Sequence, residues 1–429
     1  MEFEFTTDPA RRSFVDYGPD CHFPIQNLPF GIFSTETLTP RCCIAIGDFV
    51  LDLAAMENCG LLPRISQKNV FEQPSLNAFA GMGKAARLQI RRSVSELLDA
   101  ENAKIRDDSA LCEKVLIPQD AVTMHLPMQI GDYTDFYSSK EHATNVGIMF
   151  RGKDNALQPN WLHLPVAYHG RASSIVVSGT SVKRPSGQKM PPDADIPVFG
   201  TSAAMDFELE MGFYVGSQTA ISESVPVDTA LDHVFGLSLV NDWSARDIQR
   251  WEYVPLGPFL GKNFATTVSP WIVTLEALTP FACQIPEQVP HPLEYLSGNG
   301  KPESQAKTSF DIALEVSLAT AQSPDFSVIC KSNFRHLYWS MSQQLAHHTV
   351  NGCNVRSGDL LASGTISGST PDSFGSMLEL AWKGEKPLTL PNGEVRKMLQ
   401  DGDTVKMTGW AQGEGYRIGF GEVTGELYS

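Results

Sequence analysis

Residues 205–216, MDFELEMGFYVG, alternate apolar and acidic side chains and constrain the fold more than any other stretch. Successive side chains of a strand point to opposite faces, so this pattern predicts a half-buried strand. Asp206, Glu208 and Glu210 would then lie side by side on one face, where like charges repel. No basic residue within the segment offsets them. Two interpretations stay open: a solvated acidic strand, or a strand that binds a hard cation such as Mg²⁺ or Ca²⁺ through carboxylate oxygens.

The length and composition favour a two-domain protein that is mostly β. The chain has 429 residues, more than one hydrophobic core usually accommodates. Its 34 glycines and 28 prolines separate many short apolar runs, which favours strands and turns over long helices. In residues 41–53, Gly47 and Asp48 divide two apolar runs and predict a hairpin. A small N-terminal domain, mostly β with one helix, should end near residues 117–128, which Pro118 and Pro127 bracket.

Charge and cysteine usage limit the partners and the compartment. The formal net charge of −16 disfavours nucleic acids and anionic membrane surfaces as partners. An anionic small substrate remains compatible, because a metal ion or an arginine cluster can invert the local field. The eight cysteines form no Cys-x-x-Cys pair, which favours free thiols over a disulfide framework or a zinc site. The N-terminus lacks a signal-peptide pattern and no apolar run reaches membrane-spanning length, so we expect a cytoplasmic protein.

Two helices stand out, at residues 75–100 and 334–350. Asn333 is the expected N-cap of the second helix. His347 and His348 lie at its end, where the helix dipole favours a cation, and are interpreted as structural. The first helix carries four basic residues that lie largely outside its apolar stripe and are interpreted as a solvated face. These residues are Lys84, Arg87, Arg91 and Arg92.

Other candidate site residues lie in a polar segment and at the end of an apolar strand. The segment 132–152 contains Asp135 and His142 and is expected to be a loop, either exposed or functional. Asp242 directly follows the apolar run 234–241, a common position for a site residue, although a turn aspartate is the alternative. His142 alone fits either a surface histidine or a general base. Further strands are expected at 359–366 and 377–382, and surface excursions at 183–198 and 280–307.

Taken together, several long segments closely resemble the fumarylacetoacetase (fumarylacetoacetate hydrolase) family. They are residues 132–152, 160–174, 205–216, 241–271 and 358–382. The resemblance extends over nearly the full length and is least clear in 280–307. It implies a small N-terminal SH3-like β-barrel domain, residues 1–125, and a larger catalytic domain with the family's β-sandwich or roll, residues 126–429. It also implies a homodimer.

The resemblance further implies an ion of Mg²⁺, or Ca²⁺ in the same site, held by four carboxylates. The four are Asp135, Glu208, Glu210 and Asp242. Asp206 would lie outside this set. Lys262 and Thr266 would border the metal, and Lys262 would act through water or by balancing charge, because a protonated amine cannot ligate. The negative charge of four carboxylates exceeds the positive charge of one divalent ion. Lys262 and Arg246 would offset the remaining negative charge.

The activity that the resemblance implies is hydrolysis of the carbon–carbon bond of 4-fumarylacetoacetate to fumarate and acetoacetate, the last step of tyrosine and phenylalanine catabolism. His142 would be the general base and Glu379 its partner, since a carboxylate on one imidazole nitrogen fixes the tautomer. Lys262, Arg246 and Gln249 would stabilise the oxyanion and the departing enolate. The family's substrate contacts correspond to Tyr137, Arg151, Tyr168, Gln249, Tyr253 and Thr365.

Two alternatives to this reading come from different classes. One is another enzyme of the same fold, an acylpyruvate hydrolase or an oxaloacetate decarboxylase. The other is a catalytically silent scaffold that binds Ca²⁺. His142, Glu379 and the N-terminal domain argue against the first alternative, and the intact set of His142, Lys262 and Glu379 argues against the second.

Overall fold

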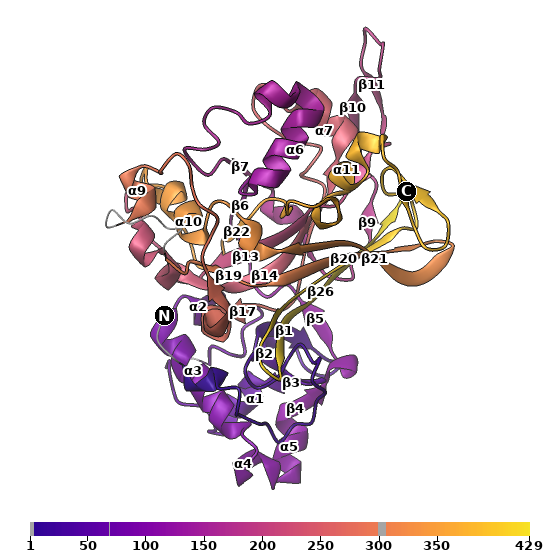
Figure 1. The fold of residues 1–429 in the computed structure, drawn as a ribbon. Coiled ribbons are helices and arrows are strands. Elements are labelled where there is room, and N and C mark those ends of the chain that lie inside the picture. Colours follow the sequence, from indigo (N-terminus) through magenta and orange to yellow (C-terminus); the bar gives the residue numbers. More distant parts are fainter. Residues whose placement is uncertain (1–3, 68, 299–305) are drawn as a thin grey trace.

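The computed structural model describes residues 4–67, 69–298 and 306–429. Strands of several sheets dominate it, and helices cover their edges and ends (Figure 1). The N-terminal residues form a body of their own at the bottom of Figure 1, and the larger remainder lies above it. This arrangement confirms the prediction of a mostly β protein with a separate N-terminal domain. No helix among the described residues is long and apolar enough to cross a membrane.

The N-terminal body is built on a five-stranded antiparallel sheet with the strand order β4-β3-β2-β1-β5. Its strands are β1 (Phe30–Ser34), β2 (Arg41–Ile46), β3 (Phe49–Asp52), β4 (Leu116–Pro118) and β5 (Thr123–His125). The hairpin predicted at Gly47 joins β2 and β3, and Gly47 has a φ of 54°, a left-handed conformation that glycine adopts without strain. Phe30 and Phe79 pack against Phe235, so the two bodies share apolar contacts.

The predicted helix at 75–100 is observed as two helices. The prediction that its four basic residues form a solvated face is only partly correct. The chain forms α2 (Asn77–Ala80) and α3 (Gly83–Leu97), which are separated where Gly83 takes a φ of 80°. Lys84 is exposed, but Arg87 and Arg91 are buried. Both arginines face the larger body or the N-terminal segment, and the helical pattern alone cannot reveal a partner so far along the chain. Three short helices complete the N-terminal body: α1 (Leu53–Asn58), α4 (Ala103–Arg106) and α5 (Ser109–Val115).

The larger body contains an eight-stranded mixed sheet that positions the candidate site. Seven strands follow the order β7-β6-β22-β13-β14-β16-β8, and β17 also pairs with β14. They are β6 (Tyr133–Phe136), β7 (Ala167–His169), β8 (Ile175–Val177), β13 (Leu209–Val215), β14 (Val234–Asp242), β16 (Thr266–Val268), β17 (Val273–Thr274) and β22 (Leu360–Ala362). Every residue of β13 is buried, so the prediction of a half-buried strand with one wet face is wrong.

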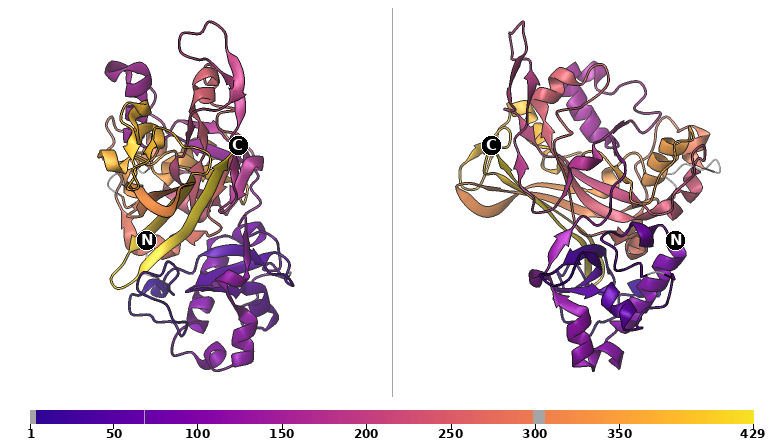
Figure 2. Two further views of the ribbon diagram at one scale, coloured as in Figure 1. Left: turned by 90° about the vertical axis from the view of Figure 1, so that its right-hand side faces the viewer. Right: turned by 180° about the vertical axis from the view of Figure 1, so that it is seen from behind.

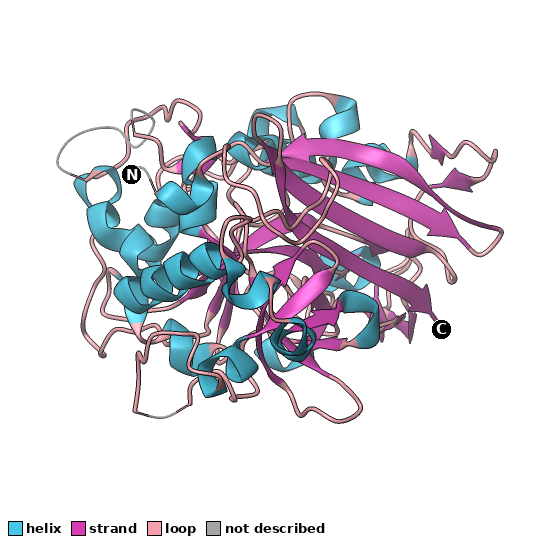
Figure 3. Cartoon of the chain, turned by 90° about the horizontal axis from the view of Figure 1, so that it is seen from below, coloured by secondary structure: helices cyan, strands magenta, loops and turns pink. Residues whose placement is uncertain are grey.

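A second sheet of five strands packs against the first, and both sheets contribute side chains to one hydrophobic core. Its order is β21-β20-β25-β26-β9, and its long strands are seen together in Figure 3. The strands are β9 (Val182–Lys183), β20 (Ala313–Thr320), β21 (Ser323–Asn333), β25 (Thr404–Gln412) and β26 (Arg417–Tyr428). The expected surface excursion at 183–198 includes a hairpin of β10 (Ser186–Lys189) and β11 (Val198–Thr201), which projects from the body (Figure 2).

Three segments differ from the sequence predictions in their secondary structure. The polar segment 132–152 is strand β6 followed by helix α6 (Lys140–Arg151), whose N-cap is Ser139. The expected strand at 377–382 is a short helix, α11 (Met377–Leu380). The expected helix at 334–350 is shorter, α10 (Met341–Thr349), and Ser340 caps it while Asn333 caps a preceding 3-10 turn. In each case a serine side chain bonds the helix N-terminus, a local signal that outweighs the apolar pattern.

The described part of the 280–307 stretch is not simply a surface excursion. It contains β18 (Ala282–Cys283) and α9 (Glu294–Ser297), and residues 299–305 of the prediction lie outside the described residues. Leu296 is fully buried, and the Gln288 amide donates to the Tyr338 carbonyl and to Gln343. The remaining short elements are β12 (Met205–Asp206), β15 (Ser244–Ala245), α7 (Arg246–Glu252), α8 (Leu275–Leu278), β19 (Ser309–Phe310), β23 (Leu388–Thr389) and β24 (Val395–Arg396).

Candidate active site

Four carboxylates from three strands and a strand junction meet at one end of the eight-stranded sheet. The group is Asp135 on β6, Glu208 between β12 and β13, Glu210 on β13 and Asp242 at the end of β14. All four are buried, and each offers an oxygen that lies within 4.8 Å of the others'. The strand order explains the meeting, because β13 pairs with β14 on one side and with β22 on the other, and β22 pairs with β6.

Two cations lie against this four-carboxylate cluster. Lys262 Nζ donates to Glu208 and to Asp242 Oδ2, the latter at 2.6 Å. Arg246 Nη2 donates to Glu208 Oε1 at 2.7 Å, and Thr266 Oγ1 donates to Asp242 Oδ1 at 3.0 Å. Burial raises the pKa of Glu208, but Lys262 and Arg246 outweigh burial and hold it below its usual value. Glu208 is therefore the carboxylate of the cluster that the protein's own cations compensate best.

The other side of the cluster lacks such compensation. Oδ1 of Asp135 and Oε1 of Glu210 are buried, and neither has a hydrogen-bond partner among the described residues. Burial, and next the charge of Asp242, raise the pKa of Asp135, while burial and the charge of Asp135 raise the pKa of Glu210. Buried acceptors without partners are rare in folded proteins. Oxygen ligands with excess negative charge suit a hard divalent cation, so the residues present fit such an ion.

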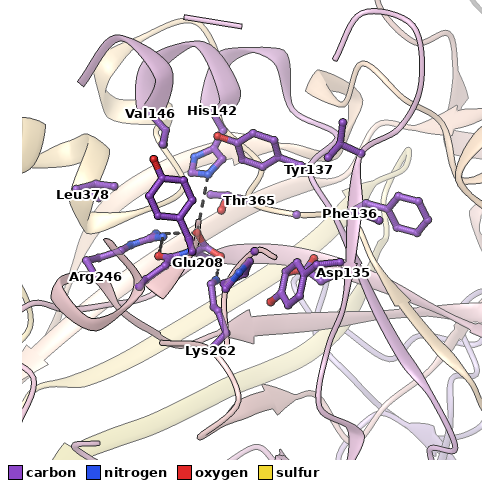
Figure 4. A pocket seen from close by; sticks show the side chains of 18 of the residues that line it. Asp135, Phe136, Tyr137, His142, Val146, Glu208, Arg246, Lys262, Thr365 and Leu378 are labelled. Atoms are coloured by element: carbon purple, nitrogen blue, oxygen red, sulfur yellow. Dashed lines mark hydrogen bonds and ion pairs between the residues drawn. The ribbon is translucent and has the colours of Figure 1, made fainter. Parts of the chain in front are cut away.

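A histidine and a carboxylate pair directly above the cluster. His142 lies in the first turn of α6 and Glu379 in α11, and Nδ1 of His142 is 2.6 Å from Glu379 Oε2. The other ring nitrogen, Nε2, lies 3.8 Å from Glu208 Oε1 (Figure 4). Burial raises the pKa of Glu379, but the charge of His142 and its hydrogen bond outweigh burial and lower it. An anionic Glu379 on Nδ1 leaves Nε2 facing the carboxylate cluster.

An open pocket of about 380 Å³ lies over the cluster and the pair. Asp135, His142, Glu208, Arg246 and Lys262 line it. Figure 4 shows these side chains together around the pocket, with His142 on the side opposite Lys262. The six residues proposed as substrate contacts all line the same pocket: Tyr137, Arg151, Tyr168, Gln249, Tyr253 and Thr365.

Several of these lining residues are already held by the protein. Tyr168 donates through its hydroxyl to Asp242 Oδ2 at 3.0 Å, and burial raises the pKa of that hydroxyl. Arg151 donates through Nε and Nη2 to the carbonyls of Asn155 and Ala156, at 3.1 and 2.7 Å. Thr365 presents a buried hydroxyl that has no partner among the described residues. The pocket therefore combines fixed cations with a few polar groups that remain free to bind.

Comparison with known proteins assigns the two bodies to one family. Residues 26–127 match the family model described as fumarylacetoacetase N-terminal, and residues 132–427 match that of the fumarylacetoacetate hydrolase C-terminal domain. Fumarylacetoacetase of Homo sapiens is 56% identical over 417 residues, which cover 97% of this chain and 98% of that protein. Fumarylacetoacetase of Arabidopsis thaliana is 53% identical over 419 residues, which cover 97% and 98%. The chain belongs to the fumarylacetoacetase family.

A solved structure supports the same fold at low sequence identity. A fumarylacetoacetate hydrolase from psychrophilic Exiguobacterium antarcticum has a TM-score of 0.52 and 16% identity, and the match covers 94% of this chain and 99% of that one. Family membership confirms the resemblance that the sequence segments indicated. The site residues of this family member come from elements spread across the whole larger body, from β6 to α11.

The structure brings together every site residue named from the sequence. The four carboxylates, Lys262 and Thr266 share hydrogen bonds or lie in one cluster, and the pair of His142 and Glu379 forms across 237 positions. Asp206 lies outside the carboxylate cluster, as the resemblance implied, but it has a role that the sequence did not indicate. Asp206 is fully buried and accepts from Arg246 Nε at 2.8 Å and from the backbone N–H groups of Met377 and Leu378, at 2.7 and 3.1 Å.

Sequence reasoning also missed the residues that hold Glu379. Asn145 Nδ2 donates to Glu379 Oε1 at 2.9 Å, while Ser367 and Ser376 donate their hydroxyls to Oε2 at 2.9 and 2.8 Å. Gly364 donates its N–H to Glu210 Oε2 at 3.0 Å with a φ of 75°, and a Cβ there would lie 2.2 Å from the Phe136 carbonyl. Asn145 lies three positions after His142 in α6, and this spacing was the one local signal available.

Proposed function

We propose that this chain hydrolyses the carbon–carbon bond of 4-fumarylacetoacetate and releases fumarate and acetoacetate. The observation that carries the proposal is the buried pair of His142 and Glu379, whose free ring nitrogen faces a four-carboxylate cluster across one pocket. The named relatives, which match over 97% of the chain, support the same reaction. The reaction adds water across one bond, so it requires a base, a polarised carbonyl and stabilisation of the departing carbon.

Asp135, Glu208, Glu210 and Asp242 would hold the divalent cation, which we propose to be Mg²⁺, with Ca²⁺ able to occupy the same ligands. The two unpartnered carboxylate oxygens support this assignment, because they are acceptors that a cation would satisfy. When bound, such a cation supplies a Lewis acid that polarises carbonyl oxygens of a diketone. Lys262 and Arg246 offset the carboxylate charge that one divalent ion leaves over, and each is held by a direct bond to Glu208.

His142 acts as the general base in this proposal. Glu379 accepts a hydrogen bond from Nδ1–H, which fixes the tautomer and the orientation of the ring, so that Nε2 is the nitrogen that takes a proton from water. The water oxygen bonds to the carbonyl carbon next to the fumaryl double bond, and the bond from that carbon to the methylene carbon breaks. The electron pair of the broken bond stays on the methylene side, which takes up a proton and leaves as acetoacetate. The fumaryl side keeps the water oxygen and leaves as fumarate.

The remaining pocket residues bind and orient the substrate. Arg151 lies at the pocket rim with two of its N–H groups fixed on carbonyls, so its charge is held in place for a carboxylate. Tyr137, Tyr253 and Thr365 add hydroxyl groups, and Tyr168 stands beside Asp242. Arg246 Nη1 donates to Gln249 Oε1 at 3.0 Å and so holds the Gln249 side chain in the pocket lining, where its amide would stabilise the oxyanion.

The wider assignments follow from the same proposal. We place the reaction in tyrosine and phenylalanine catabolism and the protein in the cytoplasm, with residues 1–125 as an N-terminal domain and 126–429 as the catalytic domain. We also propose a homodimer. Its support is a set of exposed apolar side chains on the β10–β11 hairpin and the loop after α7, an arrangement typical of interaction surfaces. They are Ile196, Phe199, Val254, Leu256 and Phe259, with exposed fractions of 75%, 77%, 69%, 94% and 65%.

A direct assay tests the reaction. Purified protein with Mg²⁺ should abolish the diketone absorbance of fumarylacetoacetate and release equal amounts of fumarate and acetoacetate. Acylpyruvates and oxaloacetate serve as controls, and each should give a much lower kcat/KM. A higher kcat/KM on an acylpyruvate would contradict the proposal, and so would a protein that binds the cation but turns over none of the three substrates.

A further inference from the structure

A second cavity, of about 660 Å³, adjoins the active-site pocket. The two hollows share four lining residues: Phe150, Arg246, Arg250 and Leu378. The other walls of the second cavity come from Lys383 and Gly384, from Val395 and residues 397–400, and from Ala203, Ala204 and Asp247. None of the roles assigned to His142, Glu379 or the carboxylate cluster requires this cavity. Because it adjoins the active-site pocket, a substrate could bind in this cavity before it enters the pocket.

The lining of the second cavity is cationic. Arg246, Arg250, Lys383 and Lys397 all contribute to it, and among its described residues Asp247 is the one acid. Asp247 is already engaged, because it accepts from Ser202 Oγ at 2.5 Å and from the Ala203 N–H at 2.8 Å. It also pairs with Lys189 at 3.5 Å. Within the described part of the chain, no carboxylate pairs with Arg250, Lys383 or Lys397, so their charges remain available to an anion.

The turn that carries Lys383 has an unusual backbone. Trp382 and Lys383 have φ values of 46° and 58°, and Gly384 follows with 86°. Two consecutive residues with side chains in the left-handed region are costly, and such strain concentrates at functional sites. The turn places Lys383 Nζ 5.0 Å from the centroid of the Phe150 ring, a residue that lines both hollows. Lys383 is therefore held at the junction of the cavity and the pocket.

We propose that the second cavity is an anion-binding entry subsite, which captures a carboxylate of the substrate through Lys383 and Lys397 before it enters the pocket. The inference rests on the proposed function, whose substrate carries two carboxylates. A chain with a net charge of −16 repels such a dianion at long range, so a local cationic surface is needed to raise its concentration at the opening. Arg250 and Arg246 continue the positive surface from the subsite to the reacting centre.

The variant Lys383→Gln with Lys397→Gln tests the subsite, and Lys386→Gln is its matched control. Lys386 is an exposed lysine of the same loop, and its Nζ lies over Trp382 rather than in the cavity. At low ionic strength the double variant should lose about tenfold in kcat/KM while kcat changes less than about twofold, the pattern of weakened capture. The difference from wild type should shrink at high salt because screening shortens the reach of surface charges. Lys383→Arg with Lys397→Arg should retain wild-type capture.

Fumarate, an unreactive dicarboxylate, gives a second readout. Its inhibition constant should rise in the double variant and stay unchanged in Lys386→Gln. Equal kcat/KM values in the double variant and the control would overturn the subsite, and so would a loss of kcat in proportion to kcat/KM. A wild type that does not hydrolyse fumarylacetoacetate would defeat the proposed function instead. In that case, calorimetric binding of fumarate to wild type and double variant still decides the inference, and equal affinities would overturn it.

Discussion

Two groups of buried charged residues differ in how fully their charges and hydrogen-bonding atoms are paired within the protein. Where the two bodies meet, Arg87 of α3 donates to both oxygens of Glu276 of α8, at 3.0 and 2.8 Å, and to the Val234 carbonyl. Arg91 donates to the carbonyls of Gln26 and Asn27 and to Thr6 Oγ1, at 2.6, 2.5 and 2.8 Å. Burial lowers the pKa of Arg91 to about 10, so it stays charged near neutral pH.

The four-carboxylate cluster is equally buried, yet its charges and hydrogen-bond acceptors are only partly paired. Two of its oxygens have no partner within the described chain, and its acids outnumber the two cations beside it. Burying charge is costly unless it is compensated, so a fully paired group stabilises the fold while an incompletely paired one needs a ligand. The contrast indicates which buried charges serve structure and which serve chemistry, a distinction that burial alone does not make.

Removal of divalent cations should have the largest effect on turnover. EDTA followed by buffer exchange should abolish hydrolysis of fumarylacetoacetate, and Mg²⁺ should restore it, because the carboxylate cluster then regains the cation its free oxygens require. Initial rates from the diketone absorbance measure the effect. The melting temperature should also rise with Mg²⁺ concentration, since a ligand that binds only the folded state stabilises it. Activity that resists EDTA would contradict the metal assignment and the contrast with the Arg87–Glu276 pair.

His142→Ala should have the next largest effect. Loss of the general base should lower kcat by about 10²–10⁴ while KM changes little, because the substrate's other contacts remain. Stopped assays with long incubation measure the residual rate. His163→Ala is the matched control, since His163 is exposed outside the pocket lining, and its kcat should equal that of wild type. Near-normal turnover of His142→Ala would remove this residue from the mechanism.

Asp206→Asn should have a smaller effect that reaches both halves of the site. Asp206 bonds Arg246, which bonds Glu208, and it also accepts from the N-terminus of the helix that carries Glu379. The amide keeps the shape but loses the charge opposite Arg246, so we expect roughly a tenfold loss of kcat and weaker Mg²⁺ binding, as for other residues that orient metal ligands. Calorimetric titration of Mg²⁺ measures the second effect. Asp232→Asn, at an exposed pair with Lys84, should change neither quantity.

Arg87→Met should have the smallest effect on turnover and a large one on stability. It leaves the Glu276 carboxylate buried without its partner, which costs about 3–5 kcal/mol of unfolding free energy, while kcat at low temperature stays unchanged. Arg87→Met with Glu276→Leu should recover most of the loss. Urea unfolding measures both. An unchanged midpoint for Arg87→Met, or a fall in its kcat, would contradict the structural role assigned to this pair.

The same pair also has a defined pH dependence. Burial raises the pKa of Glu276, but Arg87 outweighs burial and holds it below its usual value of 4.5. A carboxyl whose folded pKa is depressed stabilises the fold above its unfolded pKa and loses that contribution as pH falls through the folded pKa. The stability gap between wild type and Arg87→Met should therefore be full at neutral pH and narrow below about pH 4.5.

Features that depend on neighbouring residues were predictable from the amino-acid sequence. The hairpin at Gly47 and the strand that ends at Asp242 follow from turn chemistry and local periodicity, whereas the alternation in 205–216 placed three acids on one face and left their role open. The family segments added the remaining site residues by resemblance. Each of these inferences needs only the order of residues within one short stretch.

Which distant residues meet, and which hydrogen bonds they form, depends on the tertiary fold. His142 and Glu379 pair because α6 and α11 pack together, although one had been expected in a loop and the other in a strand. Asp206 became a link between Arg246 and α11, and Arg87 became a buried partner of Glu276 rather than part of a solvated face. Hydrogen bonds and burial depend on distances in space. These distances are set when the strands pair in the sheet, and the order of residues along the chain does not give them.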